Sequence, residues 1–399
     1  MLELEAAREK ILATLPPATA EDVDLAAALG RVLFDHLESP LDLPGFDNSA
    51  VDGYALRAAD LTSVSPEKPV NLQVVGRIEA GHTFDGEVRT GECVRLFTGS
   101  PMPRGADSVV MQEETRASGP NEIACLEAAK PWDNVRFRGE DLKKGAVIAE
   151  PGDDLHAGRL ALLAAAGFGR VKVGKRARVG LLATGSELLE PGEVPKAGKI
   201  YESNRVMLEA LSNQAGAVTR RFPVVLDTPD ATRLSLEAAL NDCDFVVTSG
   251  GVSVGEADFV KTAFAEIGGR LDFWKIAIRP GRPFAFGRIG EKYLFALPGN
   301  PGSAFVTFLL LAWPALRKWQ GASRVLPPSA PARLAETLAN RSERRSFLRV
   351  FVDAEGAARP SGLQGSHSVT SLANANGLVD VPGGTVLEAG AVVNVIRWA

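Results

Sequence analysis

The chain has 399 residues, of which 45% are hydrophobic and 23% charged, and its formal net charge is −5. At roughly 150 residues per domain this length predicts about three domains, each able to bury its own core. The negative charge argues against nucleic-acid binding as the main activity, and no apolar run approaches the roughly 18 residues of a membrane span, so neither nucleic acid nor a membrane is expected as a partner.

The first residues and the cysteines indicate the compartment. The opening decapeptide, MLELEAAREK, predicts a charged helix rather than a signal peptide. Cys93, Cys125 and Cys243 are too scattered for a metal knuckle or a disulfide framework, which is typical of reduced thiols. The sequence therefore predicts a cytoplasmic protein.

Two helices and a polar loop are predicted at the N-terminus. The first helix has an apolar stripe at helical spacing, formed by Leu4, Ala7, Ile11 and Leu15. A second helical stretch is predicted over residues 22–37. Prolines and a glycine in SPLDLPGFDNSAVDGYAL, residues 39–56, then exclude a continuing helix and place Asp52 on a polar loop. Taken alone, this loop could equally be a domain linker whose Asx side chains cap turns.

Residues 70–141 predict a β-rich insertion, because short alternating runs are separated by glycine-containing turns. TGSPMPRGADSVVMQEE, starting at Thr98, and NVRFRGEDLKKG, containing Asp141, place hydroxyls and carboxylates on those turns. Such side chains point to solvent or to a ligand. After the insertion, LHAGRLALLAAAG predicts a helix and a return to mixed α/β character.

From residue 176 onward, strands and helices alternate, which predicts a parallel sheet with helices on both faces. Ligands of such sheets bind in the loops beyond the carboxyl ends of the strands. That rule selects the loop with Thr184, Gly185 and Glu187, the loop with Asp227, residues 248–258, and residues 298–301.

The glycine-rich loop TSGGVSVGEAD, residues 248–258, is the densest of these candidates. Gly250 and Gly255 have the spacing of a P-loop, but Glu256 and Ala257 stand where Lys and Ser/Thr are required. An anion beside Asp258 would therefore need a metal ion or nearby cations. On the residues alone, a glycine turn capped by an ordinary acid remains an alternative.

The cations follow on the turn KIAIRPGRPFAFG, which carries Lys275, Arg279 and Arg282 between two predicted strands. The next loop ends at Asn300, predicted as a helix N-cap, with Pro301 in the first turn. Ser303 opens this helix, whose N–H groups would also attract an oxyanion, and Pro314 should kink or end it. Beyond residue 327 a separate β domain is predicted, in which QGSHSVTSLANANG is polar and dictates no chemistry.

Eight motifs, in this order and spacing, resemble the molybdopterin molybdenumtransferase (MoeA) family, to which the gephyrin E and plant Cnx1 E domains are related. They are PGFDNSAVDGYA, TGSPMPRGAD, RGEDLKKG, ATGSELL, YESN, TSGGVSVGEAD, IRPGRP and LPGNPGS. The resemblance spans nearly the whole chain. It implies an enzyme that inserts molybdate into adenylylated molybdopterin, with Mg²⁺ as cofactor and release of AMP. It also implies a homodimer with shared active sites, and a MogA-type protein as a possible partner.

The resemblance also implies the fold and its bounds. These are a MogA-like three-layer α/β domain with a parallel-rich sheet (1–17 and 176–326), a β-rich insertion domain (45–141), a small mixed α/β domain (18–44 and 142–175) and a C-terminal β domain (327–399).

Site residues carried over by motif fall into four groups. The catalytic set implied is Asp52, Thr98, Asp141, Glu187, Asp227 and Asp258. Metal ligands are expected at Glu187, Asp227 and Asp258. The substrate-binding set implied is Thr184, Gly185, Ser203, Asn204, Ser249, Gly250, Gly251, Ser253, Gly255, Pro298 and Pro301. Molybdate is expected at Lys275, Arg279, Arg282 and Ser303.

Two alternatives remain open at this point. One is a CinA-like nucleotide pyrophosphate hydrolase, because such proteins share the glycine-rich loop of the α/β domain. The other is a scaffold, because gephyrin also clusters receptors. The β insertion and the C-terminal domain favour the transferase over the hydrolase, since both lie inside the resemblance.

Overall fold

The computed structural model describes residues 1–79, 81–251 and 259–398. The chain divides into two compact units: unit 1 comprises Met1–Asp35, Pro151–His156 and Arg170–Ala399, and unit 2 comprises His36–Glu150 and Ala157–Gly169. The four-domain bounds given above stay a prediction. None of the helices in the described ranges combines the length and hydropathy needed to span a membrane.

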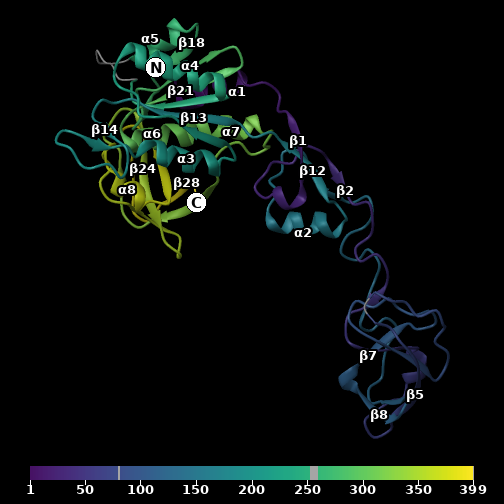
Figure 1. Cartoon of the computed structure of the whole chain (residues 1–399). Helices are drawn as coiled ribbons and strands as arrows, with labels where there is room; N and C mark the ends of the chain where they lie inside the picture. Colours follow the sequence, from purple (N-terminus) through teal and green to yellow (C-terminus); the bar gives the residue numbers. More distant parts are fainter. Residues whose placement is uncertain (80, 252–258, 399) are drawn as a thin grey trace. The chain divides into compact units, whose positions relative to one another are not determined.

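A six-stranded sheet forms the centre of unit 1 (Figure 1). Its strand order is β16-β13-β17-β21-β20-β18, in which the first four strands are parallel and the last two join antiparallel. The strands are β16 (Val218–Arg221), β13 (Arg178–Ala183), β17 (Phe245–Ser249), β21 (Lys292–Leu297), β20 (Ala285–Ile289) and β18 (Arg270–Trp274). The predicted parallel-rich sheet is confirmed, with an antiparallel edge.

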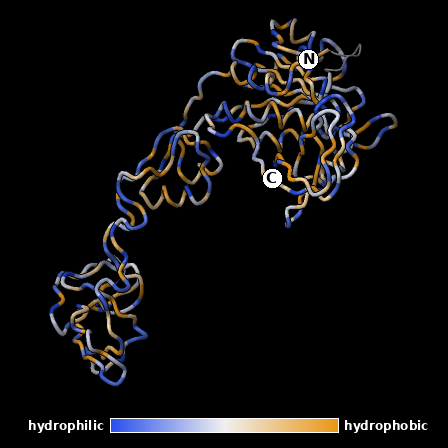
Figure 2. The backbone as a smooth tube through the Cα atoms, turned by 180° about the vertical axis from the view of Figure 1, so that it is seen from behind, coloured by the Kyte–Doolittle hydropathy of each residue, from blue (hydrophilic) through white to orange (hydrophobic). Residues whose placement is uncertain are grey.

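Helices cover both faces of this sheet, because successive residues of each strand point to opposite sides. Phe245 and Val247 of β17 pack with one group of helices, whereas Val246 packs with the other. The first group is α1 (Leu4–Ala13), α3 (Asn204–Gln214), α6 (Pro301–Thr307) and α7 (Trp313–Trp319). The second is α4 (Pro229–Asp242) and α5 (Phe259–Glu266). Figure 2 shows hydrophobic stretches running through the interior of unit 1, as a three-layer domain requires.

The C-terminal β region closes on itself. Strands β24, β25, β22, β28 and β26 pair in a ring, because β24 pairs with both β25 and β26. Their bounds are β22 (Ser329–Leu334), β24 (Arg345–Val352), β25 (Ala357–Pro360), β26 (Gly377–Val381) and β28 (Val392–Arg397). The predicted β domain is therefore a small barrel. A short strand, β19 (Ile278–Arg279), adds parallel to β24 and attaches the cationic turn to it.

Smaller elements complete this region. A two-stranded pair is formed by β23 (Leu338–Ala339) and β27 (Val386–Leu387), and α8 (Val369–Ala373) lies in the segment QGSHSVTSLANANG. The short parallel pair β14 (Leu188–Leu189) and β15 (Ile200–Tyr201) follows β13. This pair leads directly into α3.

The helix predicted over residues 22–37 is wrong. This stretch contains β1 (Ala20–Asp24), a single 3₁₀ turn, η1 (Leu25–Ala27), and β2 (Leu37–Glu38). Strand β1 pairs antiparallel with β12 (Arg170–Gly174), with Val23 opposite Val171. Gly30 then takes a left-handed φ of 71°, which ends any helix. Pairing with a distant strand thus overrides the local apolar spacing.

The long helix near residue 300 does not end at Pro314. A π-helical turn, Phe308–Ala312, joins α6 to α7, and Pro314 stands in the first turn of α7. A π turn re-routes the backbone hydrogen bonds where a proline supplies no N–H. Of the two predicted outcomes, a kink or an end, the end is wrong, because the helix continues through the π-helical turn into α7.

Unit 2 is built on a six-stranded sheet in the order β7-β4-β6-β5-β9-β8. The strands are β4 (Gly53–Leu56), β5 (Val70–Arg77), β6 (Glu92–Leu96), β7 (Ser108–Met111), β8 (Thr115–Gly119) and β9 (Glu122–Cys125), with 3₁₀ turns η2 (Ala58–Leu61) and η3 (Gln112–Glu114). Two short antiparallel pairs are β3 (Asn48–Ser49) with β10 (Val135–Arg136) and β2 with β11 (Val147–Ala149). The helix α2 (Ala157–Ala165) packs against β11. The β-rich insertion is confirmed, and Cys93 and Cys125 are free thiols in its core.

Candidate active site

The carboxyl ends of the parallel strands bring three loops of unit 1 together. The N–H of Thr184, after β13, donates to the carbonyl oxygen of Ser249 at 3.1 Å. The N–H of Gly250 donates to Leu297, and the N–H of Gly185 donates to Val225, both at 3.1 Å. The ligand edge predicted from the sequence is therefore a continuous, hydrogen-bonded rim.

A cavity of about 570 Å³, here called the acidic cavity, opens at this rim. Its carboxylates are Glu187 and Glu202, and no Lys or Arg is among the described residues that line it. Its apolar wall comes from Leu188 and Ile200. It brings together six residues predicted for catalysis or substrate binding: Thr184, Glu187, Ser203, Asn204, Ser249 and Pro301.

Two residues that line this cavity carry buried oxygens with no hydrogen-bond partner among the described residues. The Asn204 amide nitrogen donates to Ser249 Oγ at 2.6 Å and to the Gly299 carbonyl oxygen at 2.7 Å. Its Oδ1 and the Oγ1 of Thr184 are buried and have no hydrogen-bond partner within the described parts of the chain. Buried polar atoms normally have partners. Because both oxygens are shielded from solvent, they would reach a bound substrate only after a local rearrangement.

Close approach of neighbouring atoms accompanies three of the predicted glycines, and at Gly250 these atoms are backbone. Gly250 has φ 93°, and a Cβ there would lie 2.7 Å from the Thr184 carbonyl oxygen. A Cβ on Gly185 would lie 2.8 Å from a carboxylate oxygen of Glu187. Gly251, also predicted, has φ 67° and lies against Thr184 and Val260. A side chain on Gly250 would collide with the Thr184 backbone, whereas one on Gly185 would meet only the side chains of Glu187 and Leu188.

Two acids of the predicted metal set lie on neighbouring loops. The Asp227 carboxylate accepts the Ser186 N–H at 2.9 Å, and the Asp227 N–H donates to Ser186 Oγ at 3.2 Å. Glu187 follows Ser186 in the chain and lines the acidic cavity. Across residues 1–79, 81–251 and 259–398, no three His, Cys, Asp or Glu side chains form a group that could hold a metal ion. The predicted third ligand, Asp258, and the predicted Ser253 and Gly255 lie outside the described residues.

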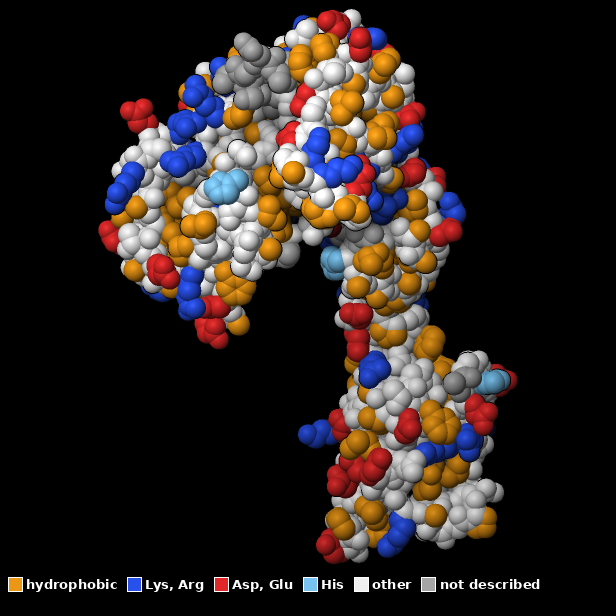
Figure 3. Space-filling model, turned by 60° about the vertical axis from the view of Figure 1, so that its left-hand side comes forward, with side chains coloured by type: hydrophobic (Ala, Val, Ile, Leu, Met, Phe, Trp, Pro, Cys, Tyr) orange, Lys and Arg blue, Asp and Glu red, His pale blue; other side chains and the backbone are white. Residues whose placement is uncertain are grey.

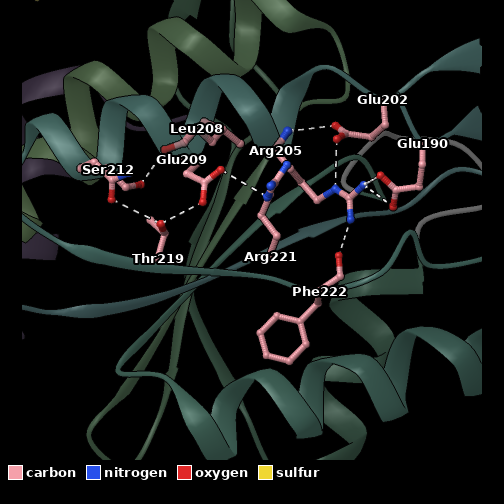
Figure 4. A network of polar contacts seen from close by, with 10 residues as sticks. Glu190, Glu202, Arg205, Leu208, Glu209, Ser212, Thr219, Arg221 and Phe222 are labelled. Atoms are coloured by element: carbon pink, nitrogen blue, oxygen red, sulfur yellow. Dashed lines mark hydrogen bonds and ion pairs between the residues drawn. The ribbon is translucent and has the colours of Figure 1, made fainter. Parts of the chain in front are cut away.

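A buried arginine supports the wall of the acidic cavity (Figure 4). Arg205 Nε donates to Glu202 Oε2 at 3.0 Å, and Nη2 donates to both Glu190 oxygens at 2.7 and 2.8 Å. A third nitrogen donates to the carbonyl oxygen of Phe222. Burial lowers the pKa of Arg205, but the bonds to Glu190 and Glu202 outweigh burial and raise it. The positive charge of Arg205 is thus paired with two carboxylates.

A second cavity of about 750 Å³, here called the basic cavity, lies between the cationic turn, the start of α6 and the barrel. Its charged lining residues are Arg279, Arg282, Arg341 and Arg344, and no Asp or Glu is among the described residues that line it. None of the four arginines forms an ion pair with a described residue. Figure 3 shows a row of Lys and Arg side chains along one edge of unit 1. The basic cavity, lined by arginines without carboxylate partners among the described residues, therefore suits an anion.

Four of the predicted residues meet in the basic cavity: Arg279, Arg282, Pro298 and Ser303. The helix N–H groups expected to attract an oxyanion are already used, because Gly302 donates to Ser366 and Ala304 donates to Asn300. Side chains rather than helix N–H groups therefore face the cavity. Lys275 is not among the described lining residues, and its ammonium lies 3.7 Å from the ring centroid of Trp274.

The two cavities share Asn300 and His367. Asn300 is the N-cap residue of α6, as predicted, but its side chain makes no capping hydrogen bond. His367 belongs to QGSHSVTSLANANG, a polar segment that was predicted to dictate no chemistry. Other residues that line the basic cavity and were not predicted are Asn340, Arg341, Arg344, Gln364, Gly365 and Ser366. The polarity of that segment was the available signal.

The remaining predicted residues lie in unit 2. The Asp52 carboxylate accepts the Thr98 N–H at 2.7 Å and the Thr98 hydroxyl at 2.9 Å. These two hydrogen bonds lower the pKa of Asp52. Asp141 follows a turn in which its N–H donates to the Leu43 carbonyl oxygen at 3.1 Å. Asp52 and Thr98 are therefore a direct pair, as a shared functional role would require.

Comparison with known proteins gives three matches to family models along the chain. Residues 2–167 match "MoeA N-terminal region (domain I and II)", residues 180–318 match "Probable molybdopterin binding domain", and residues 331–398 match "MoeA C-terminal region (domain IV)". Together these models span all the motifs of the sequence resemblance.

Full-length relatives agree with these models. A molybdopterin molybdenumtransferase of Haemophilus influenzae is 37% identical over 382 residues, covering 94% of this chain and 93% of the relative. One from Bacillus subtilis is 35% identical, covering 94% and 89%. The crystal structure of a molybdopterin biosynthesis MoeA protein from Pyrococcus horikoshii is 32% identical, covers 100% of both chains and superposes with a TM-score of 0.83.

Proposed function

The chain belongs to the MoeA family of molybdopterin molybdenumtransferases, which insert molybdate into molybdopterin in molybdenum cofactor biosynthesis, and we propose that the two cavities of unit 1 are where it does so. The acidic cavity takes the adenylylated pterin, and the basic cavity takes molybdate.

One observation carries this proposal: two cavities lined by opposite charges share a wall. Glu187 and Glu202 line one, four arginines line the other, and Asn300 and His367 belong to both. Two substrates that must react can therefore lie side by side. Holding reactants in adjacent, oriented positions removes much of the entropic barrier of a bimolecular step.

In the acidic cavity, Thr184 and Asn204 line the substrate site, and the tight Gly250 turn lets the phosphates of the substrate approach the backbone. Glu187 and Asp227, with Asp258, would hold Mg²⁺, and their carboxylate oxygens are the ligands that this ion prefers. When bound, Mg²⁺ neutralises the pyrophosphate and supports its hydrolysis to release AMP. Ser203, Ser249 and Pro301 complete the substrate wall.

In the basic cavity, Arg279 and Arg282 bind molybdate and the Ser303 hydroxyl donates to one of its oxygens. Guanidinium groups bind oxyanions through paired N–H donors. Pro298 ends the strand β21 and shapes the same wall. Lys275, which stacks on Trp274, would have to leave the ring to join this set.

The test is a molybdate titration of AMP release by Arg282→Ala. Losing one charge-assisted hydrogen bond of roughly 1.5–3 kcal/mol should raise the molybdate concentration at half-maximal turnover about tenfold or more. Binding of the adenylylated pterin should change little. Arg220→Ala, which removes an exposed arginine paired with Asp242, is the matched control. An unchanged midpoint in Arg282→Ala would place molybdate elsewhere.

We also propose a homodimer in which Asp52, Thr98 and Asp141 of unit 2 complete the site of the partner subunit. Mixing Asp52→Asn chains with Asp227→Asn chains should then restore part of the activity, because one site of each heterodimer has no substitution. Absence of recovery in purified heterodimers would refute the sharing. A MogA-type protein that delivers the adenylylated substrate, and a cytoplasmic location, complete this proposal.

The two alternatives have less support. A CinA-like hydrolase would need only the α/β domain, whereas the relatives align over the β insertion and the barrel as well. A gephyrin-like scaffold would not need a pair of oppositely charged cavities at the sheet edge.

A further inference from the structure

Among the described residues, His367 and Asn300 are the two that line both the acidic and the basic cavity. An amide does not exchange a proton at neutral pH, whereas a neutral imidazole has one nitrogen that accepts a proton and one that donates it. The other ionisable residues line one cavity only. They are Glu187, Tyr201 and Glu202 on one side, and Arg279, Arg282, Arg341 and Arg344 on the other. His367 is therefore the ionisable side chain that the two cavities have in common within the described chain.

A turn fixes the position of His367 on this shared wall. The carbonyl oxygen of Ser366 accepts the N–H of Gly302 at 2.8 Å, which attaches the turn to the first residues of α6. The N–H of Ser368 donates to the Gly365 carbonyl oxygen at 3.1 Å, and the Ser368 side chain caps α8. A Cβ on Gly365 would lie 2.7 Å from a ring carbon of His367, so the ring packs on this glycine. Backbone hydrogen bonds before and after His367 thus hold it beside the start of α6.

The ring of His367 is open to a ligand. The residue is exposed, and neither ring nitrogen is hydrogen-bonded to a described residue. His36 in unit 2 gives the contrast, because its two ring nitrogens contact the carboxylates of Glu150 at 2.7 Å and Glu38 at 3.2 Å. The imidazole of His367 has no such partner to release before it can take part in proton transfer.

Joining the two substrates requires protons to move between them. Molybdate holds its metal through oxygen ligands, whereas molybdopterin offers a pair of thiol groups. When both sulfur atoms bind molybdenum, one Mo–O bond breaks, and the protons of the two S–H groups leave with that oxygen as water. Molybdenum and sulfur keep their oxidation states, so the step consumes no oxidant or reductant. The arginines of the basic cavity cannot supply these protons, because a guanidinium does not lose its proton in proteins.

We propose that His367 is a catalytic residue for this step and carries protons from the thiols to the departing oxygen of molybdate. The proposal rests on the assignment of the pterin and of molybdate to the two cavities. The imidazole accepts a thiol proton at one nitrogen and donates from the other, as a general base and then a general acid. The two protons are transferred one after the other, and the ring is neutral again when the water leaves.

The experiment follows a single turnover of the full chain loaded with adenylylated molybdopterin and Mg²⁺, in which pterin-bound molybdenum is separated from free molybdate and quantified. In His367→Ala the rate at saturating molybdate should fall about 100-fold, the lower end of the contribution of a general acid or base. The molybdate concentration at half-maximal rate should stay the same, because Arg279 and Arg282 still bind the anion. Added imidazole should restore part of the rate, since the exposed position of the missing ring is accessible from solvent.

Three results would overturn the proposal. An unchanged rate in His367→Ala would mean that the protons move by another route. A higher molybdate concentration at half-maximal rate, with an unchanged rate at saturation, would make His367 a binding residue. A lower rate that imidazole does not restore would leave His367 with a packing role only.

Two further variants protect this result. His82→Ala removes an exposed histidine of unit 2 that lines neither cavity, and it should keep the rate and the imidazole response of the wild type. His367→Asn keeps a polar side chain but cannot carry a proton, and it repeats the test if circular dichroism shows that the Ala variant is unfolded.

Failure of this proposal and failure of the proposed function give different results. If Arg282→Ala reaches its half-maximal rate at the same molybdate concentration as the wild type, the cavity assignment is wrong whatever His367 does. If Arg282→Ala needs more molybdate but His367→Ala keeps the wild-type rate, only the role of His367 is refuted.

Discussion

The acidic and basic cavities of unit 1 share a wall but differ in the charges that line them and in the charges behind them. Behind the acidic cavity, Arg205 is held by two carboxylates and a carbonyl group. Behind the basic cavity, Arg349 is held by carbonyl groups alone. One buried cation is neutralised by the protein itself, and the other is not.

This difference indicates how the wall of each cavity responds when its ligand binds. A buried cation that the protein already pairs with carboxylates keeps its geometry with or without ligand, which suits a wall that positions Ser203 and Asn204 for a large substrate. An uncompensated charge lowers its energy when an anion arrives, which suits a cavity for a small oxyanion. The largest expected effects therefore come from breaking the Arg205 network.

Arg205→Met should destabilise unit 1 by about 3–5 kcal/mol, because it leaves the buried Glu202 carboxylate without its partner. The measurement is the free energy of unfolding in urea. Removing both charges in Arg205→Met/Glu202→Gln should recover much of the loss. Arg220→Met breaks an exposed pair with Asp242 and should cost no more than about 1 kcal/mol. Equal costs for the two single variants would contradict the comparison.

Gly302→Ala tests the packing behind the basic cavity. The added Cβ would lie 2.7 Å from Arg349 Nη1 and 2.9 Å from the Ser366 carbonyl oxygen. Such overpacking costs typically about 1–3 kcal/mol. Gly299→Ala, in the same loop, meets only Gly250 Cα at 3.6 Å and should be tolerated. The measurement is the thermal unfolding temperature of the two variants. If Gly302→Ala unfolds at the same temperature as Gly299→Ala, the residues around Gly302 move to accommodate the added methyl group.

Metal removal should affect one cavity only. Chelation with EDTA should stop AMP release while leaving molybdate binding to the basic cavity unchanged in calorimetry. Asp227→Asn should raise the Mg²⁺ concentration for half-maximal AMP release about tenfold or more, since one charged oxygen ligand is lost. Loss of molybdate binding on chelation would instead mean that the metal serves both cavities.

The smallest effect concerns Asp52 in unit 2, whose charge is stabilised mainly by two hydrogen bonds from Thr98. Two donations from Thr98 lower its pKa, so their contribution to stability is present above the ordinary Asp pKa and is lost as the pH falls through the lowered one. Thr98→Val removes the hydroxyl and should raise the pKa of Asp52, measured by carboxyl-carbon NMR. An unchanged pKa would assign the shift to the backbone N–H alone.

Sequence periodicity predicted the α/β domain well, because its strands and helices alternate locally. The bounds of α4, for example, coincide with PDATRLSLEAALND. The helix predicted over residues 22–37 failed because β1 finds its partner in β12, almost 150 residues later. A local apolar pattern carries no information about such a partner.

The acidic cavity was largely predictable, since its residues follow the strands of one sheet. The basic cavity was predictable on its cationic turn and at the start of α6, but not on its barrel side. Arg341 and Arg344 come from barrel loops whose approach to Arg279 depends on the β19–β24 pairing. Arg349 lies in the alternating run LRVFVD, where an arginine is normally read as exposed. It is buried because residues 363–365 and Gly302 cover it, while Phe351, two residues on, is exposed.

The pairing of the N-terminus with the middle of the chain has a consequence for synthesis in the cell. Leu2 forms a bridge with Ile276, and α1 buries Leu4, Ala7 and Ile11 in the core of the α/β domain. Ile276 leaves the ribosome about 270 residues after Leu2, which takes roughly 14–55 s at about 5–20 residues per second. For that time the apolar stripe of α1 lacks the part of its core that comes from residue 276 onward, and we expect the nascent N-terminus to bind chaperones that recognise exposed hydrophobic segments.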